Sequence, residues 1–505
     1  MPSKSTAQST ALMMPDTVTR IIEFAIAKNE FDWDCIKLYH VIDGIHQGQG
    51  VWEKMSRNTL QSFMTVCKTW YEITMSTPTL WATFSALLRL PQESYADYVS
   101  SMLDMHFRRS KTVPFTLFFF AKMKEISGGD NDDSSIAFRM LERAFTQQGH
   151  RLETVYISIS TKRALDYTTF TPHPIPTRRA RFTMSIGDMP LLKSFNLDLH
   201  PWSKLDRDLQ LKLVPHSRLE NMRINGDVDI SVPSSILTAT PCLPSLQNLS
   251  LSTRNTKTDS YARDILLASP NIEILRLEFQ RGSWTLPPQS SVGDLTYHSL
   301  PRLRRLDIFS GRSGTSLGML AHFSLPYLTF LKMEKFQVDD HSLKELSTTL
   351  ANCPLESCDI AIWSIEDSFH EEAFGSLLNS LGALKYLGLS FSIPLGERQK
   401  RVLEALRNAL HPGGPNEVSA LPGLQKLSVD MSFSDTSEVP GIPQSIVSTC
   451  KRKYPSDFSL RLFITISPAG ELQEVRRLLL DDTHIRQCIS DTFYVSINGF
   501  VVKKH

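Results

Sequence analysis

The 505-residue sequence lacks the features that usually mark an enzyme or a metal protein. It contains no GxxxxGK[ST] phosphate loop, no HExxH motif and no glycine-rich fingerprint after a predicted strand. The seven cysteines are odd in number and form neither a CxxC pair nor a zinc-ligand spacing, which indicates reduced thiols rather than a disulfide framework. The sequence therefore predicts no metal, no cofactor and no catalytic residue.

Segments that interact with membranes are also missing. The strongest apolar run, Val113 to Ala121, is far shorter than the roughly 20 residues that a transmembrane helix needs. The first ten residues are polar and rich in Ser and Thr, without the basic segment and apolar core of a signal peptide. We expect an intracellular protein, cytoplasmic or nuclear or both, with no membrane partner and with residues 1–12 disordered.

Charge of one sign is not in excess, since 54 Lys and Arg stand against 53 Asp and Glu. Proteins that bind nucleic acids usually carry a basic patch, because contacts to phosphate groups dominate their affinity. The sequence therefore predicts no nucleic-acid partner.

What the chain does contain is a repeat. Its unit is an apolar residue, two variable residues, an apolar residue, one variable residue and another apolar residue, usually after Pro. Clear copies begin at Leu246, Ile272, Leu303, Leu328 and Leu424, and weaker copies begin at Leu152, Leu192, Leu219, Leu355 and Leu384. From 192 to 384 the copies lie 25 to 31 residues apart, in or just beyond the range of leucine-rich repeats.

Helical patterns alternate with these apolar strands. Apolar residues at spacings of three and four predict helices over Tyr95 to Arg109, Ser135 to Gln147, Ser260 to Ala268, Ser342 to Ala351, Glu371 to Leu381 and Gln399 to Leu410. Alternating strands and helices favour right-handed crossovers and a parallel sheet. The apolar run Val113 to Phe120 could open that sheet, and Leu460 to Ile466 and Thr492 to Ile497 are expected as strands near the C-terminus. The predicted fold class is α/β, a leucine-rich-repeat solenoid over residues 91–505 with about ten repeats.

A small all-helical module is predicted before the repeats, over residues 13–90. Helices are expected at Asp16 to Ala27 and Asn58 to Met75, with an insertion at about 28–56. Three phrases stand in this module: Met14-Pro15-Asp16 followed by Val18 and Ile22, then Val66-Cys67 followed by Trp70, then Leu80-Trp81. Together they resemble the F-box, and the whole chain resembles F-box proteins with leucine-rich repeats of the divergent fungal type.

The resemblance implies a function. An F-box docks on a Skp-type adaptor, which leads to a cullin in a ubiquitin ligase, while the repeats hold a protein substrate. The positions that match the family's pattern, and that the adaptor would be expected to contact, are Pro15, Val18, Ile22, Leu60, Val66, Cys67, Trp70, Leu80 and Trp81. By this resemblance the protein is the substrate-recognition subunit and catalyses nothing itself.

Two other interpretations stay open. The aromatic and aliphatic residues of the module could form only a helical cap on the first repeat, which would make the chain a repeat scaffold without a ligase. Gly314-Thr-Ser316-Leu-Gly318 fits G-x-S-x-G, the nucleophile elbow of serine hydrolases. Four residues separate this motif from the strand before it and no HGGG-type sequence precedes it, so Ser316 is better interpreted as a loop residue.

Substrate contacts are predicted from the strand period. In a strand, residues on either side of an inward leucine point to the opposite face. In the middle repeats these flanking positions carry arginine and aromatic residues, the usual anchors of protein interfaces. The predicted substrate-binding residues on this concave face are Arg276, Arg305, Phe309, Phe330, Lys332 and Tyr386. The same rule places Tyr156 and Asp198 on the corresponding face of earlier repeats.

Overall fold

The computed structural model describes most of the chain. The described residues are 15–30, 63–89, 93–124, 133–162, 182–199, 209–226, 228–231, 242–253, 258–279, 298–310, 323–367, 369–392, 396–410, 421–433, 446, 450, 458–466, 493–497 and 500–502. The expectations for residues 1–12, for Leu60 and for most of the insertion at about 28–56 lie outside them. In this part of the chain no helix is both long and apolar enough to cross a membrane.

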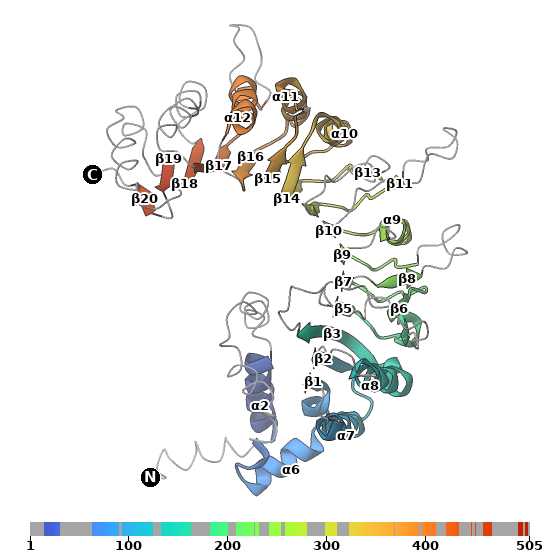
Figure 1. The fold of residues 1–505 in the computed structure, drawn as a ribbon. Helices are drawn as coiled ribbons and strands as arrows, with labels where there is room; N and C mark the ends of the chain where they lie inside the picture. Colours follow the sequence, from blue (N-terminus) through green and yellow to red (C-terminus); the bar gives the residue numbers. More distant parts are fainter. Residues whose placement is uncertain are drawn as a thin grey trace, which may run out of the picture. The chain divides into compact units, whose positions relative to one another are not determined.

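The chain divides into two compact units, Met1–Ser231 (unit 1) and Val232–His505 (unit 2). Figure 1 shows the strands and helices of each. In both units parallel strands carry the fold and helices lie between many of them in the sequence, so the protein belongs to the α/β class. The α/β class and the parallel pairing expected from the repeat are therefore confirmed.

Unit 1 begins with the helices α2 (Pro15–Glu30) and α6 (Lys68–Ser76) and the 3₁₀ turn η1 (Pro78–Trp81). The prediction of one continuous helix from Asn58 to Met75 was wrong. The chain makes a turn at residues 65–66, and Cys67 is fully extended (φ −164°, ψ 169°) as the N-cap of α6. The apolar residues keep a helical spacing across this break, so the periodicity alone gave no sign of it.

The sheet of unit 1 has the order β1-β2-β3-β5-β7, and all the pairs within it are parallel. Its strands are β1 (Thr83–Arg89), β2 (Phe115–Lys124), β3 (Leu152–Lys162), β5 (Ser194–Leu199) and β7 (Asn221–Asn225). The sheet thus opens at β1, one strand before the apolar run at 113–120 and inside the range 13–90 expected to be helical. Helix α7 (Glu93–Arg109) packs on β1, and α8 (Asp133–Gln148) packs on β2.

A second, small parallel sheet accompanies the later strands of unit 1. It consists of β4 (Phe182–Ser185), β6 (Leu209–Lys212) and β8 (Asp229–Ser231), in that order. Each of these strands lies in a connection next to β5 or β7, where later repeats have a helix. Their inward residues, such as Met184, Leu211 and Ile230, are buried. The repeat therefore completes its core here with a strand rather than with a helix.

The sheet of unit 2 follows the sequence order strand by strand. Its members are β9 (Asn248–Thr253), β10 (Ile274–Phe279), β12 (Arg305–Ser310), β14 (Phe330–Val338), β15 (Ser357–Ile365), β16 (Tyr386–Phe391), β17 (Lys426–Phe433), β18 (Ser459–Ile466), β19 (Phe493–Ile497) and β20 (Phe500–Val502). All pairs from β9 to β19 are parallel, and only β20 pairs antiparallel. The two C-terminal strands expected from the sequence are confirmed as β18 and β19.

Helices cover the strands of unit 2 from one side (Figure 1). They are α9 (Thr258–Ala268), α10 (Asp340–Leu350), α11 (Glu371–Ser380) and α12 (Glu397–Leu410), and a short sheet of β11 (His298–Ser299) and β13 (Phe323–Ser324) stands between α9 and α10 in the sequence. The predicted apolar stripe of α10 is confirmed, because Leu343, Leu346 and Leu350 are all buried. Asp339 begins this helix by accepting a hydrogen bond from Ser342 N at 2.8 Å, as an N-cap residue should.

The leucines of the repeat form two buried columns across unit 2. Leu249, Leu275, Leu306 and Leu331 lie in register on adjacent strands, and the second column runs in parallel through Leu251, Leu277, Ile308 and Met333. Each such side chain contributes roughly 1.5–3 kcal/mol when fully buried. Leu246, just before β9, is buried together with Leu249 and Leu251.

A backbone hydrogen bond also recurs once in each of these repeats. The residue directly after the first apolar position donates its N–H to the carbonyl of the equivalent residue one strand earlier. The bonds are Glu273 to Gln247, Arg304 to Glu273, Thr329 to Arg304, Glu356 to Thr329, Lys385 to Glu356 and Gln425 to Lys385, at 2.8–3.0 Å. Since this bond needs no particular side chain, repeats with different residues here share one backbone geometry.

Candidate functional site

The F-box-like residues divide into buried and exposed sets. Val18, Ile22, Leu80 and Trp81 form the core of the N-terminal helices together with Ile73, and Trp70 packs against them at the edge. Pro15, Val66 and Cys67 lie on the surface, and Val66 is 58% exposed. The buried residues therefore stabilise the module, and the exposed ones are available to a partner.

Trp81 joins the helical part of unit 1 to the start of its sheet. The side chain is 1% exposed, and its Nε1 donates a hydrogen bond to the carbonyl of Thr74 at 2.7 Å. The ring of His106 meets Trp81 edge-on at 5.0 Å between centroids. Burial lowers the pKa of His106 to about 4, so this imidazole is neutral near pH 7 and serves packing rather than proton transfer.

The predicted substrate-binding residues of unit 2 lie on one face of its sheet, opposite the leucine columns. We call this surface the polar face and define it by Arg276, Arg305, Asp307, Phe309, Phe330, Lys332, Glu334, Asp359, Tyr386 and Ser428. Arg276 is exposed, and the five other predicted residues are partly exposed. The structure thus brings all six to one surface, on strands β10, β12, β14 and β16 of one sheet.

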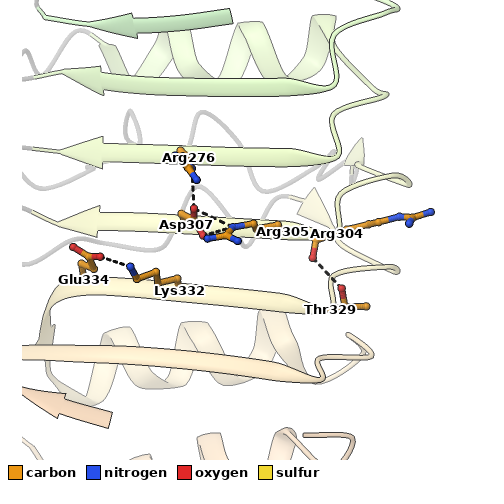
Figure 2. A network of polar contacts seen from close by, with 7 residues as sticks. All are labelled: Arg276, Arg304, Arg305, Asp307, Thr329, Lys332 and Glu334. Carbon is orange, nitrogen blue, oxygen red and sulfur yellow. Dashed lines mark hydrogen bonds and ion pairs between the residues drawn. The ribbon is translucent and has the colours of Figure 1, made fainter. Parts of the chain in front are cut away.

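Asp307 organises the middle of the polar face (Figure 2). Its carboxylate is only 2% exposed, yet it accepts hydrogen bonds from two guanidinium groups. Arg276 Nε lies 2.9 Å from Oδ2, and Arg305 Nε lies 2.9 Å from Oδ1. Both arginines use Nε for this contact. Asp307 therefore restrains both arginine side chains on the polar face.

Aromatic rings support the cations of this surface. The guanidinium carbon of Arg305 lies 4.3 Å from the centroid of the Phe330 ring, one strand away, and Lys332 Nζ lies 5.9 Å from the centroid of Phe309. Cation–π contacts at exposed sites contribute about 0.5–1 kcal/mol each. Phe309 and Phe330 thus act partly as platforms that hold Arg305 and Lys332 in place.

Strand β14 departs from regular alternation at the edge of this network. A β-bulge interrupts its register with β15 after Met333, and Lys335 there adopts a left-handed conformation with φ 55°. The extra residue lets Phe336 and Val338 return to the buried side. Just before the bulge, Lys332 Nζ and Glu334 Oε1 form an ion pair at 2.5 Å, which Figure 2 also shows.

Two important residues of the polar face were not selected from the sequence. Asp307 and Asp359 occupy flanking positions, but an acidic residue there gives no sign of being buried or paired. The signal for Asp307 was present in its neighbours, because arginines precede it on the same strand and on the strand before. The signal for Asp359 was weaker and depends on Gly388, its register partner on β16.

The equivalent face of unit 1 differs from the expectation. Tyr156 and Asp198 were expected to point to an open surface, and both are buried. Tyr156 packs among Phe118 and Phe120, with ring centroids 6.3 and 5.2 Å away, and burial raises its pKa to about 12. Asp198 accepts a hydrogen bond from Asn225 Nδ2 at 2.7 Å. This part of the sheet uses its flanking positions as core.

The hydrolase alternative cannot be placed, because Ser316 and its G-x-S-x-G motif lie outside the described residues. Among the residues that the structure describes, no group of three or more His, Cys, Asp or Glu side chains is arranged to hold a metal ion. A scan against protein-family models and a search of curated proteins found no match to this chain.

Proposed function

We propose that this chain is a non-catalytic substrate-recognition subunit of a cullin-RING ubiquitin ligase. In this proposal the polar face of unit 2 binds a protein substrate, and the N-terminal helices dock a Skp-type adaptor. The observation that carries it is the set of arginine and aromatic side chains that adjacent strands hold in register, partly exposed and already oriented. Such residues dominate the binding energy of protein interfaces.

The arginine side chains of the polar face are held in place before any partner binds, which favours a role in binding. An exposed arginine normally loses side-chain entropy when a partner fixes it, and that loss weakens binding. Here Asp307 holds Arg276 and Arg305 in advance, and the Phe330 ring lies against Arg305. A partner would meet side chains that are already ordered. The mixed charge of the surface suits a protein better than a nucleic-acid backbone.

The repeats are proposed to stack as a leucine-rich-repeat solenoid, with the polar face as its concave side. This finer description is supported by the strand order, which follows the sequence, and by the backbone hydrogen bond that recurs from one repeat to the next. In solenoids each repeat contacts mainly its neighbours and the sheet is commonly the binding surface.

The adaptor-binding half of the proposal rests on the exposed residues of the N-terminal helices. Val66 and Tyr71 are large apolar side chains on the surface, at the turn before α6 and in its first turns. Pro15 and Cys67 are exposed as well. In this proposal the exposed apolar residues beside the core of the N-terminal helices are the surface that the adaptor covers.

Pulldown with a purified Skp-type adaptor tests this half. The parent chain should capture the adaptor, and Val66→Asp should abolish capture without lowering the melting temperature, because Val66 is 58% exposed. Tyr327→Asp is the matched control, since Tyr327 is a large apolar residue of unit 2 that is 60% exposed. It should leave capture unchanged. Failure of the parent chain to bind any adaptor would favour the alternative, a repeat scaffold without a ligase.

Quantitative capture of cellular proteins tests the other half. Replacing Arg276, Phe309 and Phe330 together with Ala should deplete the proteins that the parent chain retains. Truncation of a binding hot spot costs about 2 kcal/mol or more of affinity. Thermal melts must show that the triple variant is folded. A folded triple variant that retains every partner would remove the polar face as the binding surface. If a serine-hydrolase probe labels the parent chain but not the Ser316→Ala variant, the enzyme alternative would be supported instead.

A further inference from the structure

Gly388 is the position in the middle row of the polar face where a side chain is missing. On the strands around it, Lys332, Asp359, Gly388 and Ser428 lie in register, one on each strand from β14 to β17. A Cβ atom added to Gly388 would lie 2.5 Å from Asp359 Oδ1 and 2.9 Å from Tyr386 Oη. The two oxygens therefore converge over this glycine, in space that any other residue would occupy.

Asp359 differs from the other acids in the centre of this face. Asp307 has two arginines, and Glu334 has Lys332. Asp359 makes no hydrogen bond or ion pair with any residue that the structure describes. Burial raises the pKa of its carboxyl group, although the charge of Lys332 acts in the opposite direction. A partly buried carboxylate that has no protein donor is stabilised when a ligand supplies one.

The hydroxyl of Tyr386 is the second acceptor at this point. Burial raises the pKa of Tyr386, the nearby charge of Asp359 raises it further, and a hydrogen bond with the Ser428 side chain acts the other way. Since Tyr386 stays protonated, its hydroxyl oxygen keeps a lone pair that can accept a hydrogen bond from a ligand. Asp359 and Tyr386 together thus present a charged and a neutral acceptor close together.

The cations around this point already have other contacts. Lys332 pairs with Glu334, and Lys426 Nζ lies 5.1 Å from the centroid of the Tyr386 ring. Arg461, on the strand after β17, acts on the pKa of Tyr386 but makes no ion pair with Asp359. The two basic residues nearby, Lys332 and Lys426, are matched in number by two acidic ones, Glu334 and Asp430. Among the charged residues that define the polar face, Asp359 is the one for which the described residues supply no ion pair.

We infer that Asp359 and Tyr386, over Gly388, form a subsite for the guanidinium group of an arginine side chain on the bound protein. A guanidinium is planar and presents parallel N–H donors, so it can bond to two neighbouring oxygens at once. A lysine ammonium is a single point charge and bridges them less well. This inference rests on the proposal that the polar face binds a protein, and it names the residue that this part of the face selects.

A displayed library of short random peptides, selected on the full chain, tests the inference. The selected peptides should be rich in arginine. Asp359→Asn keeps the shape of the side chain and removes its charge, and it should weaken their binding by about tenfold or more. Replacing the peptide arginine by citrulline, its neutral isostere, should have the same effect on the parent chain and little effect on Asp359→Asn. Replacing it by lysine should give an intermediate loss.

Gly388→Ala is a second, independent variant. It keeps every charge but places a methyl group where the two oxygens meet, so it should weaken arginine peptides as Asp359→Asn does. Asp430→Asn is the matched control. Asp430 is an exposed carboxylate on the neighbouring strand β17, and burial raises its pKa too, but its oxygens are not among the atoms that meet over Gly388. It should change binding by no more than about twofold, as expected for a screened surface charge.

The outcomes separate this inference from the proposed function. Peptides that depend on Arg276 and Phe330 but bind Asp359→Asn normally would overturn the arginine subsite and leave the polar face intact. Peptides that accept lysine as well as arginine would overturn the choice of guanidinium. Peptides that depend on none of these residues, or a failure to select any peptide, would overturn both the subsite and the binding role of the face.

Discussion

The two units use the same strand positions in opposite ways. In unit 1 the positions that flank the inward residues carry Phe118, Phe120 and Tyr156, which are buried and pack on one another. In unit 2 the same positions carry Arg305, Phe330 and similar residues, which stay partly exposed and hold charges in place. A parallel strand thus fixes which residues face the leucine core, while the neighbouring side chains decide whether the other face is core or binding surface.

The most direct test of this difference compares two phenylalanines. Phe118→Ala in unit 1 should lower the free energy of unfolding by about 3–5 kcal/mol, because it leaves a cavity in a buried aromatic cluster. Phe330→Ala in unit 2 should lower it by only about 0.5–1 kcal/mol, mainly by removing the cation–π contact with Arg305. Denaturant titration of each variant, followed by signals from each unit, gives both values. Equal losses would mean that the two faces are not different in kind.

Features of the fold that depend on residues close together in the sequence were predictable, and features that depend on other contacts were not. The leucine columns and the helices beside them were predictable, because period and spacing are local properties of the chain. The break at Val66 and Cys67 was not, since the apolar spacing continues through it. The bulge at Lys335 was hidden for a similar reason, because inward residues resume on either side of it.

The candidate site was predictable only as a set of positions. Strand alternation correctly gathered Arg276, Arg305 and Phe330 on one surface, and it placed Tyr156 there by the same rule. Burial of Tyr156 depends on Phe118 and Phe120, which come from another strand. The convergence of Asp359 and Tyr386 over Gly388 likewise depends on register between strands, which a single repeat does not contain.

A second prediction sharpens the comparison on the side of unit 2. Asp307→Asn removes a buried charge that two arginines contact, so it should destabilise unit 2 by about 1.5–3 kcal/mol, the range for hydrogen bonds to charged groups. The partly exposed arginines can be hydrated afterwards, which limits the loss. Asp340→Asn is the control, because Asp340 pairs with an exposed His370 and should cost at most about 1 kcal/mol. A larger loss for Asp340→Asn than for Asp307→Asn would contradict the central role of Asp307.

A smaller effect is expected for the pair of Lys332 and Glu334. A double-mutant cycle with Ala at each position should give a coupling free energy of about 0.2–1 kcal/mol, because both side chains are about one-third exposed and water screens them. The coupling should shrink as salt is added. A coupling well above this range would show that the edge of the polar face is as rigid as its centre, and the contrast with a solvated binding surface would then fail.

The smallest effect is expected for Asp359→Asn, and the direction of the change in melting temperature decides how this residue is interpreted. Burial raises the pKa of Asp359, so the folded chain disfavours its charged form, and near neutral pH that charge reduces stability. Asp359→Asn removes the charge and should leave the melting temperature unchanged or slightly raised, although the attraction of Lys332 for the carboxylate reduces the gain. The gain should shrink as the pH falls through the raised pKa of Asp359 and disappear below the ordinary pKa of an aspartate, where the parent side chain is neutral in the unfolded chain as well as in the folded one. Melting curves of both chains at neutral and acid pH give the comparison.

Every buried residue of unit 1's aromatic cluster should destabilise the fold when it is altered, whereas a residue kept for binding can reduce stability in the free protein. A clear fall in melting temperature for Asp359→Asn at neutral pH would place Asp359 with the first group, as part of the structure rather than of a site that awaits a ligand.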